Sequence, residues 1–275
     1  MTWNAEELDM DAYTARIGYT GDLKQDAETL RGLHRAHVDA IPFENLEMML
    51  GRPVPLDLPA LQDKLVNRRR GGYCYEHNLL FAAVLERIGF PVRGLGARVR
   101  LGAGSVRPVT HMLTRVWAGE REWLCDVGFG ASGLREPIPL EDGAQGTQGA
   151  WEFGVEKERE GDGAWVLRSR QPDGWRDVYA FTLEERLPVD YVVLNHYTST
   201  HPRSGFIRRP VVQYGIGDAR RLLTGSEFVV EYADGRRTER EVEAGELGSV
   251  LDREFGIELS AAELTALVRA HYAGE

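Results

Sequence analysis

The chain has 275 residues, 43% hydrophobic and 28% charged, as is typical of globular proteins with more than one structural layer. Its formal net charge of −10 argues against a nucleic-acid partner, because binding a polyphosphate needs a clustered basic face and the run at 68–70 is too short. No apolar stretch is long enough to predict a membrane span, and the acidic opening of the sequence predicts no secretory signal, so we expect a cytoplasmic protein.

Residues 1–90 are predicted to be mainly helical. Asp26 precedes a run with apolar residues at helical spacing that ends at Ile41, just before a proline. Asp57 caps a second helix, which has a proline in its first turn. A third helix begins near Cys74 and ends at Gly89.

Residues 91–195 have the pattern of short antiparallel strands. Runs with β-branched or aromatic residues are separated by glycine, proline and charged turns, which predicts a sheet or a small barrel. The predicted strands are 92–101, 112–117, 123–127, 151–155, 165–168 and 175–181. The glycine- and glutamine-rich segment 141–149 is predicted to be a loop.

Residues 196–275 mix both kinds of element. An Asp-Gly turn at 234–235 between two β-rich runs predicts a hairpin. Ser260 and Glu263 form a capping box that begins the final helix. Helical, β and mixed segments in this order predict an α+β protein.

The only two cysteines are Cys74 and Cys125. Without a Cys-x-x-Cys pair they do not predict a structural zinc site, and we expect no metal. A disulfide between them is open in principle, but the cytosol keeps thiols reduced. We therefore interpret both as reactive or buried thiols.

Cys74 lies in the segment Arg-Gly-Gly-Tyr-Cys-Tyr-Glu-His-Asn at 70–78. The two glycines allow a tight turn and a close approach to another group. The cysteine then falls in the first turn of a helix, where unsatisfied amides and the helix dipole favour a thiolate. From this segment alone, a nucleophile and a buried structural thiol are equally good interpretations.

Seven histidines could supply a base. His34, His37 and His271 lie on predicted helices, where we expect them at the surface. His77 follows Cys74 by three residues, so we expect its ring to point across the helix surface and not at the sulfur. His111 begins a predicted strand and can project into a cleft, although a strand histidine taken alone is more often structural.

Asp126 lies in the apolar segment at 124–130 and is costly to bury without a partner. That partner is either the backbone of the glycine turn that follows it or the imidazole of His111 on an adjacent strand. The spacing between the two leaves room for a strand, a turn at Gly119 and a return strand. A base oriented by a third group is the arrangement used in nucleophilic catalysis.

On these motifs the sequence resembles the arylamine N-acetyltransferase family. The resemblance is carried by segments 70–78, 110–111 and 126–130, and it extends to 41–46, 137–140 and 195–202. It covers nearly the whole chain in the expected order. One departure stands out: the residue after Glu76 is usually leucine in this family, and here it is His77.

The resemblance implies an α+β fold with a helical bundle over 1–90, an antiparallel β-barrel over 91–195 and an α/β lid over 196–275. These parts would surround a cysteine-protease-like core in which Cys74 is the nucleophile, His111 its base and Asp126 the orienting carboxylate. The implied reaction is ping-pong transfer of an acetyl group from acetyl-coenzyme A to a small aromatic amine or hydrazine through acetyl-cysteine. Acetyl-coenzyme A is then a substrate, and no bound cofactor is expected.

The resemblance also implies residues that line the acceptor site, where flat apolar walls suit an aromatic amine. Ordinary core packing is the alternative interpretation for each of them. They are Phe43, Val99, Phe129 and Phe206.

Further contacts follow from the same resemblance. Thr110 and Gly130 would contact coenzyme A. The amide of Cys74 is a candidate oxyanion donor. Arg70 and Glu44 would pair beneath the turn that carries the cysteine, or form a plain surface salt bridge.

Three other functions are rivals to this interpretation. An amide synthase that releases or cyclises a carrier-bound polyketide chain would use the same scaffold and the same three residues. A cysteine hydrolase would replace the amine with water. A catalytically silent binder would need a defect in the triad, and the sequence contains none. A homo-oligomer is left open.

Overall fold

Helices form most of the N-terminal part of the structure, as the sequence predicts. The computed structural model describes residues 2–159 and 163–272. The helical elements up to residue 90 are η1 (Ala5–Glu7), α1 (Met10–Ile17), α2 (Ala27–Ala40), α3 (Leu46–Met49), α4 (Leu58–Gln62), η2 (Asp63–Asn67) and α5 (Cys74–Ile88). Among the described residues, no helix is long and apolar enough to cross a membrane.

The predicted helix ends are confirmed. The side chain of Asp26 accepts a hydrogen bond from the amide of Thr29 and begins α2, and Asp57 caps α4 in the same way. Helix α5 ends before Gly89, whose φ of 108° lies in the left-handed region that glycine tolerates best. Helices α1, α2 and α5 share one apolar core with the faces of β2, β3 and β4 that lie beneath them.

The central sheet curls into a nearly closed antiparallel barrel. Its strand order is β5-β4-β3-β2-β9-β8-β7-β6, and the outer strands β5 and β6 lie close together. The bounds are β2 (Val92–Val99), β3 (His111–Ala118), β4 (Arg121–Cys125), β5 (Ile138–Pro139), β6 (Ala144–Gln148), β7 (Trp151–Lys157), β8 (Trp165–Gln171) and β9 (Gly174–Phe181).

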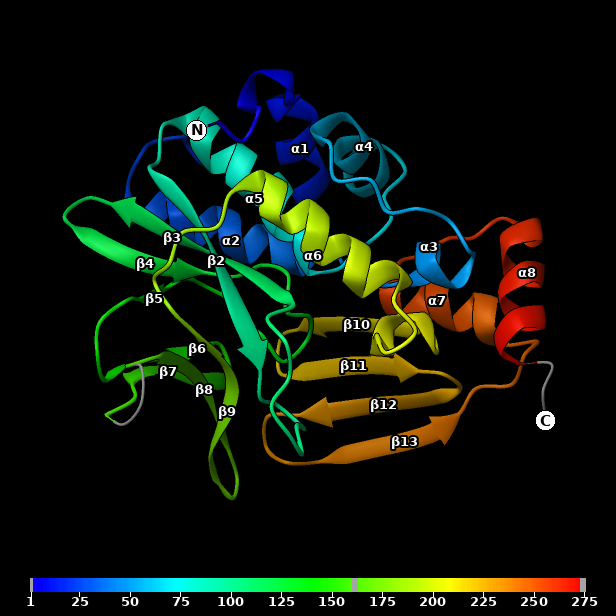
Figure 1. Cartoon of the computed structure of the whole chain (residues 1–275). Coiled ribbons are helices and arrows are strands. Elements are labelled where there is room, and N and C mark those ends of the chain that lie inside the picture. Colours follow the sequence, from blue (N-terminus) through cyan, green and yellow to red (C-terminus); the bar gives the residue numbers. More distant parts are fainter. Residues whose placement is uncertain (1, 160–162, 273–275) are drawn as a thin grey trace.

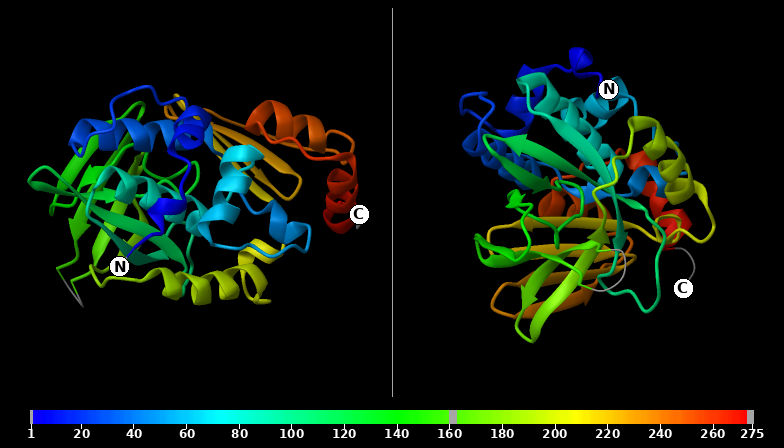
Figure 2. Two further views of the ribbon diagram at one scale, coloured as in Figure 1. Left: turned by 90° about the horizontal axis from the view of Figure 1, so that it is seen from above. Right: turned by 60° about the vertical axis from the view of Figure 1, so that its left-hand side comes forward.

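A second antiparallel sheet lies beside the barrel, and helices flank it (Figures 1 and 2). Its strands, in order, are β1 (Phe43–Glu44), β10 (Val211–Ile216), β11 (Ala219–Thr224), β12 (Glu227–Tyr232) and β13 (Arg237–Glu241). The helical elements of this region are α6 (Pro188–Thr200), η3 (Gly205–Ile207), α7 (Leu247–Phe255) and α8 (Ala261–His271). The α+β class is therefore confirmed.

Two local predictions in the C-terminal part are also confirmed. Strands β12 and β13 form the hairpin expected around the turn at 234–235. Ser260 and Glu263 form the capping box that begins α8, with each backbone amide bonded to the other side chain. The division of the chain at residues 90 and 195 stays a prediction, and α6 runs across residue 195.

Strand β1 joins the N-terminal part of the chain to the second sheet. Phe43 pairs with Gln213 of β10 on one side and forms a parallel bridge with Gly72 on the other. The sequence predicts mainly helices before residue 90 and no strand there. This short strand exists because β10, far along the chain, supplies its partner, and nothing local to residues 43–44 signals it.

The predicted loop at 141–149 is wrong. Residues Ala144–Gln148 form β6, which pairs with β7 at the end of the barrel sheet. Glycine and glutamine have low strand propensity, but pairing with a well-formed neighbour overrides it. Gln148 is buried, and its side-chain oxygen accepts hydrogen bonds from the amides of Arg135 and Glu136.

The expectation that His34 and His37 lie at the surface is also wrong, since both are fully buried on the inner face of α2. Each ring has hydrogen-bonding partners that offset the loss of water. His34 lies between the amide of Asp126 and the carbonyl of Arg135, and His37 contacts the hydroxyl of Tyr13. His271 is half-buried on α8.

The buried histidines predict that the fold weakens in mild acid. Burial lowers the pKa of His34 and of His77 to about 4, and it lowers that of His37 well below its usual value. Because these folded-state pKa values lie below the unfolded value, the stabilisation is complete above pH 6.5 and is lost as pH falls towards 4. We expect a loss of about 3 kcal/mol in the free energy of unfolding for each histidine that must become charged.

Urea denaturation between pH 7 and pH 5 measures the part of this loss that falls within that range, about 2 kcal/mol for each histidine whose pKa falls to about 4. The variant His34→Gln should show a shallower dependence on pH than the unaltered chain. His111 does not cancel the effect, because its pKa is raised and its stabilisation is retained in acid. An unfolding free energy that is constant between these two pH values would contradict the prediction.

Candidate active site

Cys74 is the first residue of α5 and is almost fully buried. Its Sγ lies 3.7 Å from the carbonyl oxygen of Thr110. The two glycines before it are needed for close packing. A Cβ at Gly71 would lie 2.2 Å from the carbonyl oxygen of Pro42, and one at Gly72 would lie 2.9 Å from a Glu76 carboxylate oxygen.

His111 and Asp126 are brought together by the hairpin of β3 and β4. His111 is the first residue of β3, and Asp126 directly follows β4. The imidazole Nε2 lies 2.7 Å from Oδ2 of the carboxylate, and both side chains are buried. The other carboxylate oxygen accepts a hydrogen bond of 3.0 Å from the amide of Gly128. Both partners considered for Asp126 are therefore present.

Asn78 connects this pair to the helix that carries Cys74. Its amide nitrogen donates to Oδ1 of Asp126 at 3.0 Å and to the carbonyl of Met112 at 2.8 Å. Its side-chain oxygen accepts from the amide of Val127 at 3.1 Å. Sequence reasoning gave Asn78 no role, although it is part of the 70–78 segment. One turn of α5 therefore carries both the thiol and the amide that holds the carboxylate.

The charges in this cluster reinforce one another. Burial by itself would lower the pKa of His111, but the Asp126 carboxylate and the nearby Cys74 sulfur raise it above its usual value. Burial would raise the pKa of Asp126, but His111, Asn78 and the Gly128 amide hold it below its usual value. The arrangement favours an imidazolium beside a carboxylate, with the sulfur next to it.

One cavity of about 250 Å³ opens onto Cys74 and His111. All four residues predicted for the acceptor site line it, together with Thr110. They are Phe43, Val99, Phe129 and Phe206. The ring of Phe129 meets the imidazole of His111 edge-on, with 5.1 Å between ring centroids. The structure adds lining residues that sequence reasoning missed, namely Leu101, Ser132, Gln213 and Leu222.

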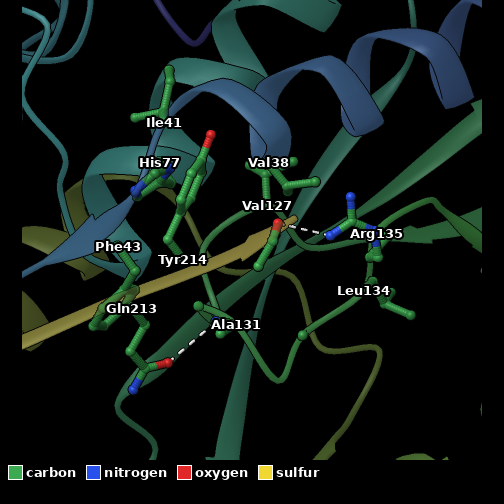
Figure 3. Close-up of a pocket in the computed structure, with 13 residues that line it drawn as sticks. Val38, Ile41, Phe43, His77, Val127, Ala131, Leu134, Arg135, Gln213 and Tyr214 are labelled. Atoms are coloured by element: carbon green, nitrogen blue, oxygen red, sulfur yellow. Dashed lines mark hydrogen bonds between the residues drawn. The ribbon is translucent and has the colours of Figure 1, made fainter. Parts of the chain in front are cut away.

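Gly130 lines a neighbouring cavity and not the one at Cys74. Figure 3 shows this second cavity between α2, the loop that follows β4, and β10. Phe43 and Gln213 border both cavities. The Gln213 side-chain oxygen accepts a hydrogen bond of 3.2 Å from the amide of Ala131, so β10 holds the loop that follows Asp126.

Buried charges lie beneath the turn that leads into Cys74. Arg70 donates to Glu44 at 3.1 Å with both side chains buried, so their pair is not a surface salt bridge. Lys64 donates to Glu76 at 2.7 Å. The second carboxylate oxygen of Glu76 accepts a hydrogen bond of 3.0 Å from the amide of Tyr73.

Cys125 has no part in this cluster. It is a free, fully buried thiol that pairs with Thr114 across β3 and β4, and burial raises its pKa well above the usual value. Cys74 is also free, so the disulfide considered from the sequence is absent between these two described residues. Within residues 2–159 and 163–272, no group of His, Cys, Asp and Glu could hold a metal ion.

Gly128 fixes how closely the Asp126 loop approaches α5. A Cβ at this position would lie 2.8 Å from both Cα and the carbonyl oxygen of Cys74, and 2.6 Å from the Asn78 amide nitrogen. We expect Gly128→Ala to lower the free energy of unfolding by about 1–3 kcal/mol, because backbone atoms must move apart. Urea denaturation measures the change.

Gly146→Ala is the matched control, since a Cβ there meets nothing within 4 Å and the residue has no left-handed φ. Its stability should stay within about 0.5 kcal/mol of the unaltered chain. Equal stabilities for the two variants would contradict the packing argument.

Comparison with known proteins places the whole arrangement in one family. The N-acetyltransferase family model matches residues 26–264. An arylamine N-acetyltransferase of Mycobacterium tuberculosis is 38% identical over 259 residues, covering 92% of this chain and 90% of the relative.

Solved structures agree. The arylamine N-acetyltransferase of Nocardia farcinica superposes with a TM-score of 0.93 at 48% identity, covering 97% of this chain and 95% of that one. The Mycobacterium marinum enzyme in complex with CoA superposes with a TM-score of 0.87 at 33% identity, over 95% of this chain and 99% of that one. The chain therefore belongs to the arylamine N-acetyltransferase family and is an acyltransferase.

Proposed function

We propose that the chain transfers an acetyl group from acetyl-coenzyme A to the nitrogen of an arylamine or arylhydrazine through an acetyl-Cys74 intermediate. The observation that carries the proposal is the single cavity in which Cys74 lies beside His111, which Asp126 orients at 2.7 Å. Family membership supports the acetyl donor and the acceptor class, as does the CoA complex of the Mycobacterium marinum relative.

In the first half-reaction the thiolate of Cys74 attacks the acetyl carbonyl of acetyl-coenzyme A. A bond forms between Cys74 Sγ and the acetyl carbon, and the bond from that carbon to the coenzyme A sulfur breaks. His111 starts as an imidazolium that balances the thiolate, and it can give its proton to the departing sulfur. The amide of Cys74 lies in the first turn of α5, where amides lack intrahelical acceptors, and it can bind the oxyanion.

In the second half-reaction the amine nitrogen attacks acetyl-Cys74. The nitrogen–carbon bond forms, the carbon–sulfur bond breaks, and His111 takes the proton that the nitrogen releases. A thioester suits this step because it stays reactive towards an amine. The acidity of Asp126 keeps its carboxylate charged throughout, so that it orients the imidazole in both steps.

The walls of the cavity support an aromatic acceptor. Phe43 and Phe206 line it with 5.9 Å between ring centroids, and Phe129 lines it with its ring against His111. We assign Thr110, whose backbone carbonyl faces the sulfur, to the donor side together with Gly130 in the adjoining cavity. The cytoplasmic location expected from the sequence stays a prediction.

Release of free coenzyme A from acetyl-coenzyme A tests the proposal. We expect sustained, multiple-turnover release that depends on an arylamine or arylhydrazine, is abolished in Cys74→Ala, and is retained in Cys125→Ala because that thiol lies outside the cluster. Asp126→Asn should slow release by at least ~10²-fold through loss of the imidazole orientation. Repeated turnover without amine, beyond one coenzyme A released per protein molecule, would identify a hydrolase, and no release by folded protein would favour a carrier-bound acyl donor.

The acceptor wall predicts a separate kinetic effect. Phe206 is half-buried on η3, and the variant Phe206→Ala removes one aromatic face of the cavity. We expect the KM for the arylamine to rise by about tenfold, since burying a ring against an aromatic acceptor contributes at least about 1.5 kcal/mol. Leu23→Ala, at an exposed position outside the cavity, is the control. An unchanged KM in Phe206→Ala would remove Phe206 from the acceptor site.

A further inference from the structure

His77 is buried within the protein instead of lying on the surface of α5. Its Nδ1 lies 2.9 Å from Nε2 of His37, and Nδ1 of His37 lies 2.8 Å from the hydroxyl of Tyr13. On its other side, Nε2 of His77 lies 3.0 Å from the carbonyl oxygen of Gly72 and 3.2 Å from that of Pro42. All three side chains of this chain of contacts are fully or almost fully buried.

Each hydrogen bond in the series from Tyr13 through His37 and His77 to Gly72 has a fixed direction. Carbonyl oxygens only accept, so Nε2 of His77 must be the nitrogen that donates. Burial lowers the pKa of His77 to about 4, so its ring is neutral near pH 7 and Nδ1 is an acceptor. His37 must then donate from Nε2 to His77. The remaining His37 nitrogen, Nδ1, accepts from the hydroxyl of Tyr13.

This series of hydrogen bonds ends at the peptide unit between Gly72 and Tyr73, which directly precedes Cys74. The carbonyl of Gly72 receives His77 Nε2 and also the amide of Glu44 at 2.7 Å. The amide of the same peptide unit, on Tyr73, donates to Glu76 at 3.0 Å. His77 and Glu76 both belong to the first turn of α5. This turn therefore binds both the carbonyl and the amide of the peptide unit that precedes it.

We propose that His77 is a positioning residue for Cys74, and that Tyr13 and His37 keep His77 in the tautomer that donates to the Gly72 carbonyl. The inference rests on the proposed acetyl transfer. Cys74 follows the clamped peptide by one residue, so any rotation of that peptide moves the thiolate and the Cys74 amide together. Tyr13 acts from α1, on the far side of His37, and touches neither the cavity nor the sulfur.

Leucine at position 77 would fill similar space but could neither donate to Gly72 nor accept from His37. Glutamine could do both, because its amide nitrogen donates and its oxygen accepts. His77→Leu and His77→Gln therefore separate the hydrogen bonds from the volume of the side chain. Leu33→Ala is a control for lost stability, since Leu33 is buried in the same helical core and lines neither cavity.

The test is a single-turnover measurement of coenzyme A release from acetyl-coenzyme A without amine, with melting temperatures measured alongside. We expect His77→Leu to slow acylation about tenfold, as misplacement of a reacting group does, and His77→Gln to recover most of the rate. Leu33→Ala should lose stability yet keep its rate. Tyr13→Phe should slow acylation less than His77→Leu, because it removes only the hydrogen bond to His37 that lies farthest from Cys74.

Acylation by His77→Leu at the rate of the unaltered chain would overturn the proposal. An equal slowing in Leu33→Ala at matched stability would also do so. Coupling across the hydrogen bond between His37 Nε2 and His77 Nδ1, measured by ¹⁵N NMR on the unaltered protein, gives a readout that no variant has to fold for. Its absence, or a His77 ring protonated at Nδ1, would overturn the proposal as well.

Failure of the proposed function is distinguishable from failure of this inference. If the unaltered protein releases no coenzyme A, acetyl transfer is wrong, and the rate of Cys74 alkylation by iodoacetamide replaces acylation as the readout. A lower alkylation rate in His77→Leu than in His77→Gln then supports the positioning role, and equal rates overturn it.

Discussion

The buried carboxylate of Asp126 is the constraint on which the rest of the site depends. A charge removed from water must be compensated by hydrogen bonds and opposite charge, or the fold pays several kcal/mol. Here His111, Asn78 and the Gly128 amide bond its two oxygens, and His34 bonds its backbone amide. The partners of the carboxylate come from α5, β3 and the loop after β4, and His34 adds α2 through the backbone amide, so the contacts of this one residue hold four parts of the chain together.

The nucleophile is held from the opposite side by a second buried polar cluster. Glu76, paired with Lys64, holds the amide that precedes Cys74, while Glu44 receives Arg70. Strand β1 carries Glu44 of this cluster and pairs with β10 on one side and with Gly72 on the other, so the second sheet is anchored to the turn that carries the thiol. The cavity therefore has rigid walls on the side of the nucleophile, as precise positioning of reacting groups requires.

Local signals predicted those features that depend on neighbours in sequence. Capping by Asp26 and the stop at Gly89 follow from backbone chemistry within a few residues. The hairpin between His111 and Asp126 follows from their spacing and the turn between them. Several features that depend on distant partners, among them strands β1 and β6 and the role of Asn78, were missed or wrong.

The surface assignment of His34 and His37 failed because helical periodicity treats histidine as polar and carries no record of a partner far along the chain. The loop predicted at 141–149 was wrong for the same reason. Pairing with β7, and not the local composition, makes residues 144–148 a strand. The series of hydrogen bonds through His77 joins Tyr13, His37 and His77 from three different helices, which lie too far apart in the sequence for a local pattern to reveal it. Only the departure from leucine at this position marked it in advance.

If Cys74 becomes acetylated on the path to product, the acetylated protein can be isolated. The protein is mixed with acetyl-coenzyme A alone, freed of small molecules, and digested for mass spectrometry, and a second portion is first exposed to an arylamine. We predict one acetyl group on the peptide that contains Cys74 in the first portion, and its disappearance in the second portion with formation of the acetylated amine. Steady turnover in the presence of amine with no acetyl group on Cys74 in the first portion would contradict the account, because it would mean direct transfer between the two substrates.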